Sequence, residues 1–184
     1  MRAEVGGQGR AVARSDSRDD ARLIAKIAQG DLRAFDALYR TYHARLTRFL
    51  VGMVHRSQMV EEVLDDTMLV VWNRPDTYNG ASKVSTWIFA IAYRKALNAM
   101  RRQDEPIEDT DAENRASDDA SPEQLLGQRQ VREALSSAMG ELSADHRVVV
   151  DLAYFHELEY REIAEIMSCP EDTVKTRMCQ RVAI

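Results

Sequence analysis

The hydrophobic positions of this chain recur every three or four residues, which is the spacing of amphipathic helices. One series runs from Phe35 to Met53, and a second runs from Val60 to Trp72. The second series ends before Pro75, because proline disfavours a helical conformation at the residue that precedes it. No segment alternates apolar and polar residues with the period of two that is typical of a half-buried strand. The pattern therefore predicts an all-α fold.

A third helical series follows the turn-forming pair Asn79-Gly80 and extends to Arg102. Ser82 or Ser85 could act as its N-cap, since a serine hydroxyl accepts hydrogen bonds from the first backbone N–H groups of a helix. We therefore expect this helix to begin within a few residues of the turn.

The pattern changes at residues 104–122, where Asp, Glu, Ser, Ala and Asn dominate and a proline stands near each end. Low apolar content and dense like charge are typical of a solvated linker, and a structureless stretch of about 20 residues is uncommon inside one compact domain. We therefore predict two small helical domains, residues 21–103 and 123–184, joined by a flexible acidic linker. Residues 1–20 have charges and glycines but no apolar series, so we expect a flexible N-terminal extension there.

The second domain is predicted to contain helices over residues 123–139 and 143–155, with Ser143 as the N-cap of the latter. Two short helices follow, over residues 160–167 and from Glu171 onward. This order of a helix, a tight turn and a second helix is that of a helix-turn-helix unit.

Within this unit, Ser168-Cys169-Pro170 forms the predicted turn. Ile163 and Met167 can pack inward from the first helix, and Val174 and Met178 supply the buried face of the second helix. A helix of this kind fits the DNA major groove, where cations contact phosphates and guanine edges. The residues that its exposed face would offer are Thr173, Lys175, Thr176, Arg177 and, beyond them, Arg181. An ordinary helical hairpin with a solvated basic face is the alternative, and the pattern alone leaves it open.

Charge is distributed unevenly along the chain. The formal net charge is −5, which by itself argues against a simple nucleic-acid-binding protein. Residues 74–103, however, hold six cations against one acid, and the last twelve residues hold three cations and no acid. Between these two basic segments, residues 104–123 hold nine acids against one arginine. The net charge therefore conceals two basic segments that an acidic one separates.

The first basic segment also contains aromatic residues, namely Tyr78, Trp87, Phe89 and Tyr93. Aromatic rings among cations suit single-stranded nucleic acid, because bases stack on the rings while cations follow the phosphates. The alternative is that these rings belong to the core, and we favour that interpretation for most of Trp87, whose edge alone would reach the surface.

The helix over residues 60–72 carries an acidic edge opposite its apolar stripe. This acidic edge consists of Glu61, Glu62, Asp65 and Asp66, and Leu69 and Val70 extend it with apolar surface. Simple solvation of charged residues and a protein-binding surface explain the edge equally well from the sequence alone.

Other classes of protein find little support in the sequence. No apolar run approaches the roughly 20 residues of a membrane helix, and the N-terminus lacks the apolar region of a secretory signal. Cys169 and Cys179 lack CxxC spacing, which favours a reducing cytoplasm. We see no nucleophile–base pair, phosphate loop or metal cluster, and the four histidines are scattered without ligand spacing. We therefore expect no enzyme activity, no cofactor and no metal site.

Four segments together resemble the extracytoplasmic-function (ECF) group of sigma-70-family RNA polymerase sigma factors. Residues 35–42, FDALYRTY, resemble the start of region 2, and residues 60–72, VEEVLDDTMLVVW, resemble region 2.2. Residues 85–98, STWIFAIAYRKALN, resemble regions 2.3 and 2.4. The fourth segment, which consists of residues 142–154 together with residues 160–177, resembles region 4. Each block alone is weakly specific, but the four occur in the family's order around an acidic linker.

The resemblance implies a function and a set of partners. It implies a promoter-specificity factor that binds core RNA polymerase, at the β′ clamp helices and the β flap, and promoter DNA. It also implies control by an anti-sigma factor, which is often anchored in the inner membrane, while the chain itself would not insert into a membrane.

The resemblance also assigns site residues. Polymerase would bind the acidic edge through Glu62, Asp65, Asp66 and Leu69. The −10 element would be opened and held by Tyr78, Asn79, Lys83, Trp87, Arg94 and Asn98. The helix that starts near Glu171 would read the −35 element as duplex, through the exposed residues of the helix-turn-helix unit.

One departure from the family pattern concerns the C-terminus. Family members usually continue the last helix with several more basic residues, whereas this sequence gives CQRVAI over residues 179–184. Phosphate contacts dominate affinity for DNA, so we expect −35 binding to be weak or to depend on polymerase. A sigma-like decoy that sequesters an anti-sigma factor without binding DNA is the alternative function, although a decoy would not need the basic and aromatic segment.

Overall fold

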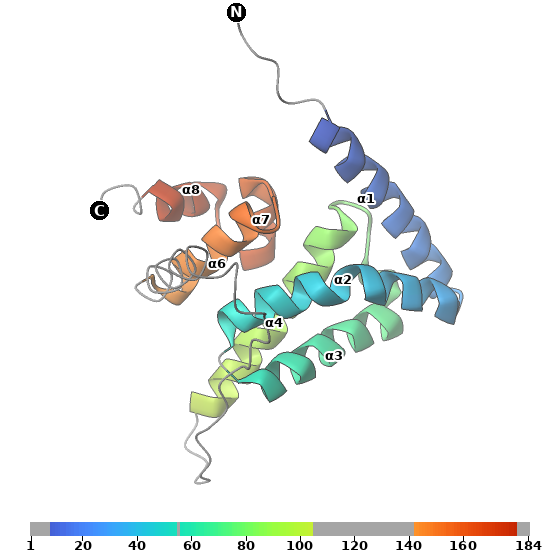
Figure 1. Ribbon diagram of the computed structural model, residues 1–184, viewed down its shortest axis with the longest axis horizontal. Helices are drawn as coiled ribbons and strands as arrows, with labels where there is room; N and C mark the ends of the chain where they lie inside the picture. The colour runs from blue at the N-terminus through green and yellow to red at the C-terminus, as the bar shows by residue number, and fades with distance from the viewer. Residues whose placement is uncertain (1–7, 55, 105–141, 180–184) are drawn as a thin grey trace, which may run out of the picture.

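The computed structural model of the chain describes residues 8–54, 56–104 and 142–179 (Figure 1). Within these ranges the secondary structure is helical, as the hydrophobic pattern predicted. The elements are α1 (Gln8–Ile27), α2 (Leu32–Met53), α3 (Ser57–Asn73), the 3₁₀ turn η1 (Pro75–Thr77), α4 (Val84–Asp104), α6 (Ala144–Tyr154), α7 (Tyr160–Met167) and α8 (Glu171–Cys179). The predicted linker, apart from its first residue, and the predicted helix over residues 123–139 lie outside the described residues.

Helices α1 to α4 form the N-terminal domain, whose core is built from one apolar stripe per helix. Leu38, Leu46 and Leu50 of α2 are fully buried, as are Val71 of α3 and Ile88 of α4. Each of these side chains falls on the predicted stripe of its helix, so the 3.6-residue periodicity of the sequence translates directly into the packed core. Burying a leucine or isoleucine side chain stabilises a domain by about 1.5–3 kcal/mol.

The chain enters α2 and α4 through two turns of different chemistry. Gly30 adopts a positive φ of 81° between α1 and α2, and Asp31 then caps α2 by accepting hydrogen bonds from the N–H groups of Arg33 (2.9 Å) and Ala34 (3.2 Å). At α4 the Lys83 carbonyl accepts the first helical hydrogen bond, from Trp87 N–H. Lys83 rather than Ser82 or Ser85 therefore occupies the N-cap position.

Helix α1 begins at Gln8, so residues 8–20, for which we predicted a flexible extension, are helical in the structure. Asp20 is only 8% exposed, and the hydroxyl of Tyr42 on α2 donates a hydrogen bond to its carboxylate. Ile24 and Ile27 of α1 are buried against the same core. The apolar positions of this helix begin only at its C-terminal half, because Asp20 occupies the inward position one turn before Ile24.

Helices α6 to α8 form the C-terminal domain and contain the predicted helix-turn-helix. Ser143 caps α6 by accepting from His146 N–H, as predicted. Ser168 ends α7 in the left-handed conformation, with φ of 53°, and the chain then turns into α8. Ile163, Met167 and Val174 are buried, as predicted for this motif, whereas Met178 is only partly buried.

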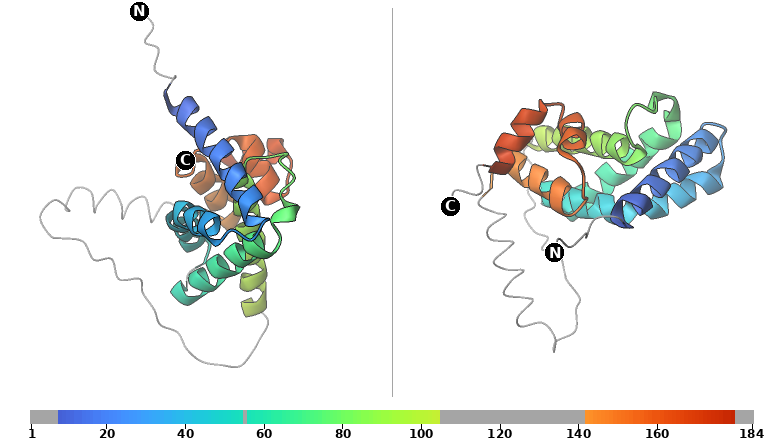
Figure 2. Two further views of the ribbon diagram at one scale, coloured as in Figure 1. Left: turned by 90° about the vertical axis from the view of Figure 1, so that its right-hand side faces the viewer. Right: turned by 90° about the horizontal axis from the view of Figure 1, so that it is seen from above.

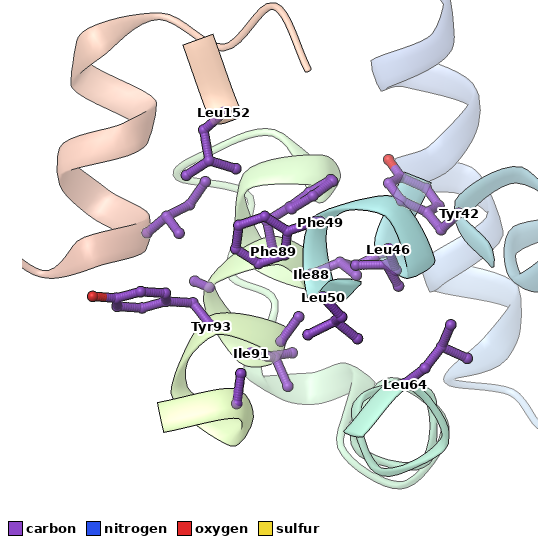
Figure 3. Packing of buried hydrophobic residues seen from close by; sticks show 14 of the residues in the cluster. Tyr42, Leu46, Phe49, Leu50, Leu64, Ile88, Phe89, Ile91, Tyr93 and Leu152 are labelled. Atoms are coloured by element: carbon purple, nitrogen blue, oxygen red, sulfur yellow. The ribbon is translucent and has the colours of Figure 1, made fainter. Parts of the chain in front are cut away.

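The two domains lie against each other. Helix α7 packs along α4, and α6 packs on α2, so the orange and red helices sit beside the cyan and yellow-green ones in both views of Figure 2. Phe49 of α2 and Phe89 of α4 meet at 5.2 Å between ring centroids, and Leu152 of α6 lies opposite them (Figure 3). The buried apolar side chains of the two domains form one continuous cluster.

Candidate polymerase and nucleic-acid interfaces

The acidic edge lies on the outer face of α3. Glu62 and Asp65 are exposed, and Leu69, two helical turns beyond Glu62, is 55% exposed. Asp66 is half-exposed and its carboxylate lies 3.0 Å from Nζ of Lys95 on α4. All four residues have the spacing of a single helix face. The structure therefore brings the four predicted polymerase-binding residues together as a mixed acidic and apolar surface.

The acidic edge also affects a neighbouring aromatic residue. Burial raises the pKa of Tyr39 on α2, and the negative charge of Asp65 raises it further. Beside this tyrosine, Phe35 and Trp72 meet edge to face at 5.3 Å. An aromatic cluster thus supports the N-terminal side of α2 against the end of α3 and holds the acidic edge on a rigid element.

The loop before α4 holds Tyr78 and Asn79 in defined positions. The Tyr78 hydroxyl donates a hydrogen bond to the Ser82 carbonyl at 2.9 Å, which closes the loop. The Asn79 side-chain oxygen accepts from Ala81 N–H at 2.9 Å, and Gly80 between them has a positive φ of 73°. Burial raises the pKa of Tyr78, and the nearby charge of Asp20 adds to this shift. The turn predicted from Asn79-Gly80 is therefore confirmed.

Trp87 occupies an intermediate position between core and surface, as we favoured from the sequence. Its ring lies 5.5 Å from that of Tyr78 at an interplanar angle of 50°, and the residue is partly buried against the core. By contrast Phe89 is fully buried and Tyr93 is 7% exposed. Among the aromatic residues of this segment, Tyr78 and Trp87 are thus the ones with ring surface available to a base.

Arg94 and Asn98 are both exposed on α4, one turn apart. Arg94 Nε donates a hydrogen bond to the Ala90 carbonyl at 3.0 Å, and this bond orients the guanidinium group along the helix. With Lys83 and Trp87 they share one side of the helix, at spacings of four, seven and four residues. This arrangement offers an aromatic surface near the helix start and polar groups farther along it.

Lys83 makes a contact that the sequence did not indicate. Its Nζ lies 2.9 Å from Oε1 of Glu162 on α7, and the hydroxyl of Thr86 donates to the same oxygen at 3.1 Å. No local pattern signals a pairing between residues so far apart in the chain. Thr86 and Glu162 are therefore neighbours of a predicted site residue that sequence reasoning missed.

Helix α8 carries four of the five predicted −35 residues, and its cations are paired with acids of the same domain. Lys175 Nζ lies 2.9 Å from Glu171 and 3.4 Å from Asp172, and these acids raise the pKa of the lysine. Arg177 reaches across to the carboxylate of Asp145 on α6. The positive charge that the sequence placed on this helix is therefore partly neutralised within the domain.

The two hydroxyl residues of the set differ in exposure. Thr176 is exposed and its hydroxyl donates to the Asp172 carbonyl at 2.8 Å, whereas Thr173 is half-buried. The remaining predicted residue, Arg181, lies outside the described residues.

Among the described residues, no group of three or more His, Cys, Asp or Glu side chains is arranged to hold a metal ion. None of the helices in the described ranges combines the length and the apolar character that crossing a membrane requires.

Comparison with known proteins identifies the family to which this fold belongs. The family description "Sigma-70 region 2" matches residues 38–105, and "Sigma-70, region 4" matches residues 132–180. The ECF RNA polymerase sigma-E factor of Salmonella typhimurium is 30% identical over 174 residues, which cover 89% of this chain and 91% of that protein.

Solved structures show the same fold. CnrH, in complex with the cytosolic domain of CnrY, superposes with a TM-score of 0.66 at 20% identity and covers 90% of this chain and 93% of its own. The sigma factor RpoE of Bartonella quintana, in complex with the anti-sigma factor NepR, superposes with a TM-score of 0.60 at 20% identity and covers 82% of this chain and 92% of its own. With both family regions matched in order, the chain belongs to the ECF group of sigma-70-family RNA polymerase sigma factors.

Proposed function

We propose that this sigma factor binds core RNA polymerase through the acidic edge of α3 and promoter DNA through α4 and α8. The observation that carries the proposal is the surface at the start of α4. There the ring pair of Tyr78 and Trp87 lies beside Lys83, with further polar groups along the helix. Base stacking on aromatic rings contributes about 1–3 kcal/mol per base whatever the sequence, so this surface suits a melted −10 element.

The assignment of the acidic edge to polymerase rests on charge and exposure. Interface centres combine apolar contact with a polar rim, and Leu69 with the surrounding carboxylates has that composition. The proposed partners on core polymerase are the β′ clamp helices for this edge and the β flap for the C-terminal domain. We place the protein in the cytoplasm, where polymerase acts.

We propose that α8 contributes only modestly to binding of the −35 element and that this contribution depends on polymerase. Phosphate contacts require cations that are free to leave their intramolecular partners, and Lys175 and Arg177 are both paired with acids. Base contacts by α8 therefore compete with ion pairs inside the domain.

We also propose control by an anti-sigma factor. The support comes from the shared fold with RpoE of Bartonella quintana, which was solved in complex with the anti-sigma factor NepR. The complex of CnrH with a cytosolic domain of CnrY fits an inhibitor anchored in the membrane.

The test is run-off transcription with core polymerase on a library of promoters. Initiation above core polymerase alone is expected, and Asp65→Ala should reduce holoenzyme assembly several-fold while Asp36→Ala, an exposed acid on α2, leaves it unchanged. Arg94→Ala should reduce open-complex formation, with Arg33→Ala on α2 as its matched control. No initiation on any promoter would refute the proposal and favour a decoy that only sequesters an anti-sigma factor.

A further inference from the structure

A buried pair of polar side chains joins α1 to α2 inside the N-terminal domain. The carboxylate of Asp20 on α1 is 8% exposed, and it accepts a hydrogen bond from the hydroxyl of Tyr42, which is 1% exposed. The Ser85 side chain, at the second position of α4, also forms a hydrogen bond with Tyr42. Tyr42 therefore connects α1, through Asp20, with the beginning of α4, through Ser85.

Helix α1 also lies against the segment that leads into α4, residues 74–83, which we call the α3–α4 loop. Helix α1 packs on the 3₁₀ turn η1 of this loop and on α4, and Figure 1 shows the loop beside α1. Tyr78 of the loop and Trp87 of α4 form the ring pair, with 5.5 Å between ring centroids. Burial raises the pKa of Tyr78, and the negative charge of Asp20 raises it further, so the buried carboxylate lies close to one ring of the pair.

Stability alone does not require a carboxylate at position 20. Removing one partner of a buried hydrogen bond is costly, but replacing both partners by apolar groups of similar shape is often nearly neutral. A leucine at position 20 would extend the apolar stripe of Ile24 and Ile27 by one turn. The polar pair supplies direction instead, because a hydrogen bond constrains the distance and angle between its partners, whereas the hydrophobic effect is non-directional.

We propose that Asp20 and Tyr42 are positioning residues for the −10 site, whose hydrogen bond fixes α1 against the α3–α4 loop and thereby sets the place of the ring pair. This role rests on the proposed binding of melted DNA by the ring pair. Both positioning residues are buried, so they act on DNA only through the loop. A binding group must be held in its productive geometry by the side chains behind it, so a loop without this support loses affinity although its rings are intact.

The variant that tests this role is the double change Asp20→Leu with Tyr42→Phe, which replaces both partners by apolar side chains and keeps the core filled. Asp19→Leu is the matched control, because Asp19 is the preceding residue of α1, is exposed and pairs with Arg22 at 3.4 Å on the same helix. A second test variant, Asp20→Asn, keeps an oxygen that accepts from the Tyr42 hydroxyl but removes the charge. Urea denaturation verifies that each variant is folded under the conditions of the assays.

The first measurement follows the loop in the free full-length chain. The sequence has two tryptophans, so a Trp72→Phe background leaves Trp87 as the single indole fluorophore. Acrylamide, a neutral quencher, then reports how accessible the Trp87 ring is, whatever charge the variant carries. Emission should shift to the red and quenching should increase in the double variant, while Asp20→Asn and the control should match the parent. Unchanged emission and quenching in the double variant would overturn the positioning role.

The second measurement is the affinity of the holoenzyme for a pool of single-stranded DNA of random sequence, compared with that of core polymerase alone. A pool is suitable because base stacking tolerates any sequence. The double variant should bind about tenfold more weakly than the parent, as expected for the loss of one stacked base. Affinity for core polymerase should stay constant in every variant, because the acidic edge of α3 is unchanged.

Trp87→Ala, which removes one ring of the pair, separates the positioning role from the proposed function. If Trp87→Ala weakens DNA binding and the double variant does not, the positioning role is refuted and the −10 function of the ring pair stands. If neither variant weakens DNA binding, the −10 function is refuted, and the positioning role fails with it. A loss in Asp20→Asn as large as that in the double variant would also overturn the role assigned to the hydrogen bond, because this variant keeps an acceptor for Tyr42.

Discussion

The buried hydrogen bond between Tyr42 and Asp20 gives a quantitative prediction about how α1 is held. Tyr42→Phe removes one hydroxyl without changing the shape of the ring. Its hydroxyl donates to a carboxylate that is 8% exposed, and a hydrogen bond to a charged group contributes about 1.5–3 kcal/mol. We therefore expect the free energy of unfolding to fall by about 2 kcal/mol at neutral pH, with faster amide exchange at the end of α1.

The pH dependence of this loss checks its origin. Burial raises the pKa of Tyr42 far above the ordinary value for tyrosine, and the charge of Asp20 and the hydrogen bond to it add to the shift. A raised folded-state pKa contributes stability that is complete below the unfolded pKa of about 10 and is lost as pH rises above it. The parent should lose this contribution by about 1.4 kcal/mol per pH unit above pH 10, and Tyr42→Phe should not.

The assay is urea denaturation, followed by circular dichroism, between pH 7 and pH 11. Tyr39→Phe is the matched control, because Tyr39 lies one turn earlier on α2 and is only partly buried; its change should stay below about 0.5 kcal/mol. The difference between the parent and Tyr42→Phe should be near 2 kcal/mol at pH 7 and should shrink above pH 10. A difference below about 0.5 kcal/mol at pH 7, or one that grows at high pH, would refute the reasoning.

Three further predictions concern a helix cap, the core and the −35 surface. Asp31→Ala should lower the free energy of unfolding by about 1 kcal/mol through loss of the α2 cap, measured by urea denaturation, and an effect in Asp31→Asn of the same size would contradict this. Phe89→Ala should cost about 3–5 kcal/mol, and a loss below 1 kcal/mol in the same assay would show that the ring is not core. Asp145→Asn should free Arg177, tighten holoenzyme binding to promoter duplex and steepen its salt dependence by about 0.9 per added phosphate contact; an unchanged salt slope would show that the ion pair does not limit binding.

Periodicity predicted α2, α3 and α4 because their core positions repeat at helical spacing and the matching side chains are buried. Local chemistry predicted the turn at Asn79-Gly80 and the cap at Ser143, since a turn or a cap depends on a few adjacent residues. The helix-turn-helix followed from both kinds of signal. These features share one property, namely that the interactions which form them lie within a few residues of one another in sequence.

The features that the sequence did not show depend on contacts between distant residues. The early part of α1 escaped because Asp20, a polar residue, takes an inward position where the pattern requires an apolar one. The pairing of Lys83 with Glu162 joins two domains, and neither residue is distinguishable in sequence from a solvated surface charge. The roles assigned to the acidic edge and to the individual DNA-facing residues remain predictions, because they depend on complementary surfaces of polymerase and DNA.

The ion pairs give a physical reason for a DNA-directed protein to have net negative charge. Lys83 and Arg177, two of the cations that we assign to DNA, rest on Glu162 and Asp145 in the free protein. Each of these cations must give up its carboxylate before it can contact a phosphate, and a cation that stays on its carboxylate neutralises no phosphate. Because counterion release sets the salt dependence of DNA binding, the free protein should show a smaller salt slope than its cation count suggests. Non-specific binding to duplex is weakened by the same exchange, so we expect selection of a promoter to depend on the assembled holoenzyme.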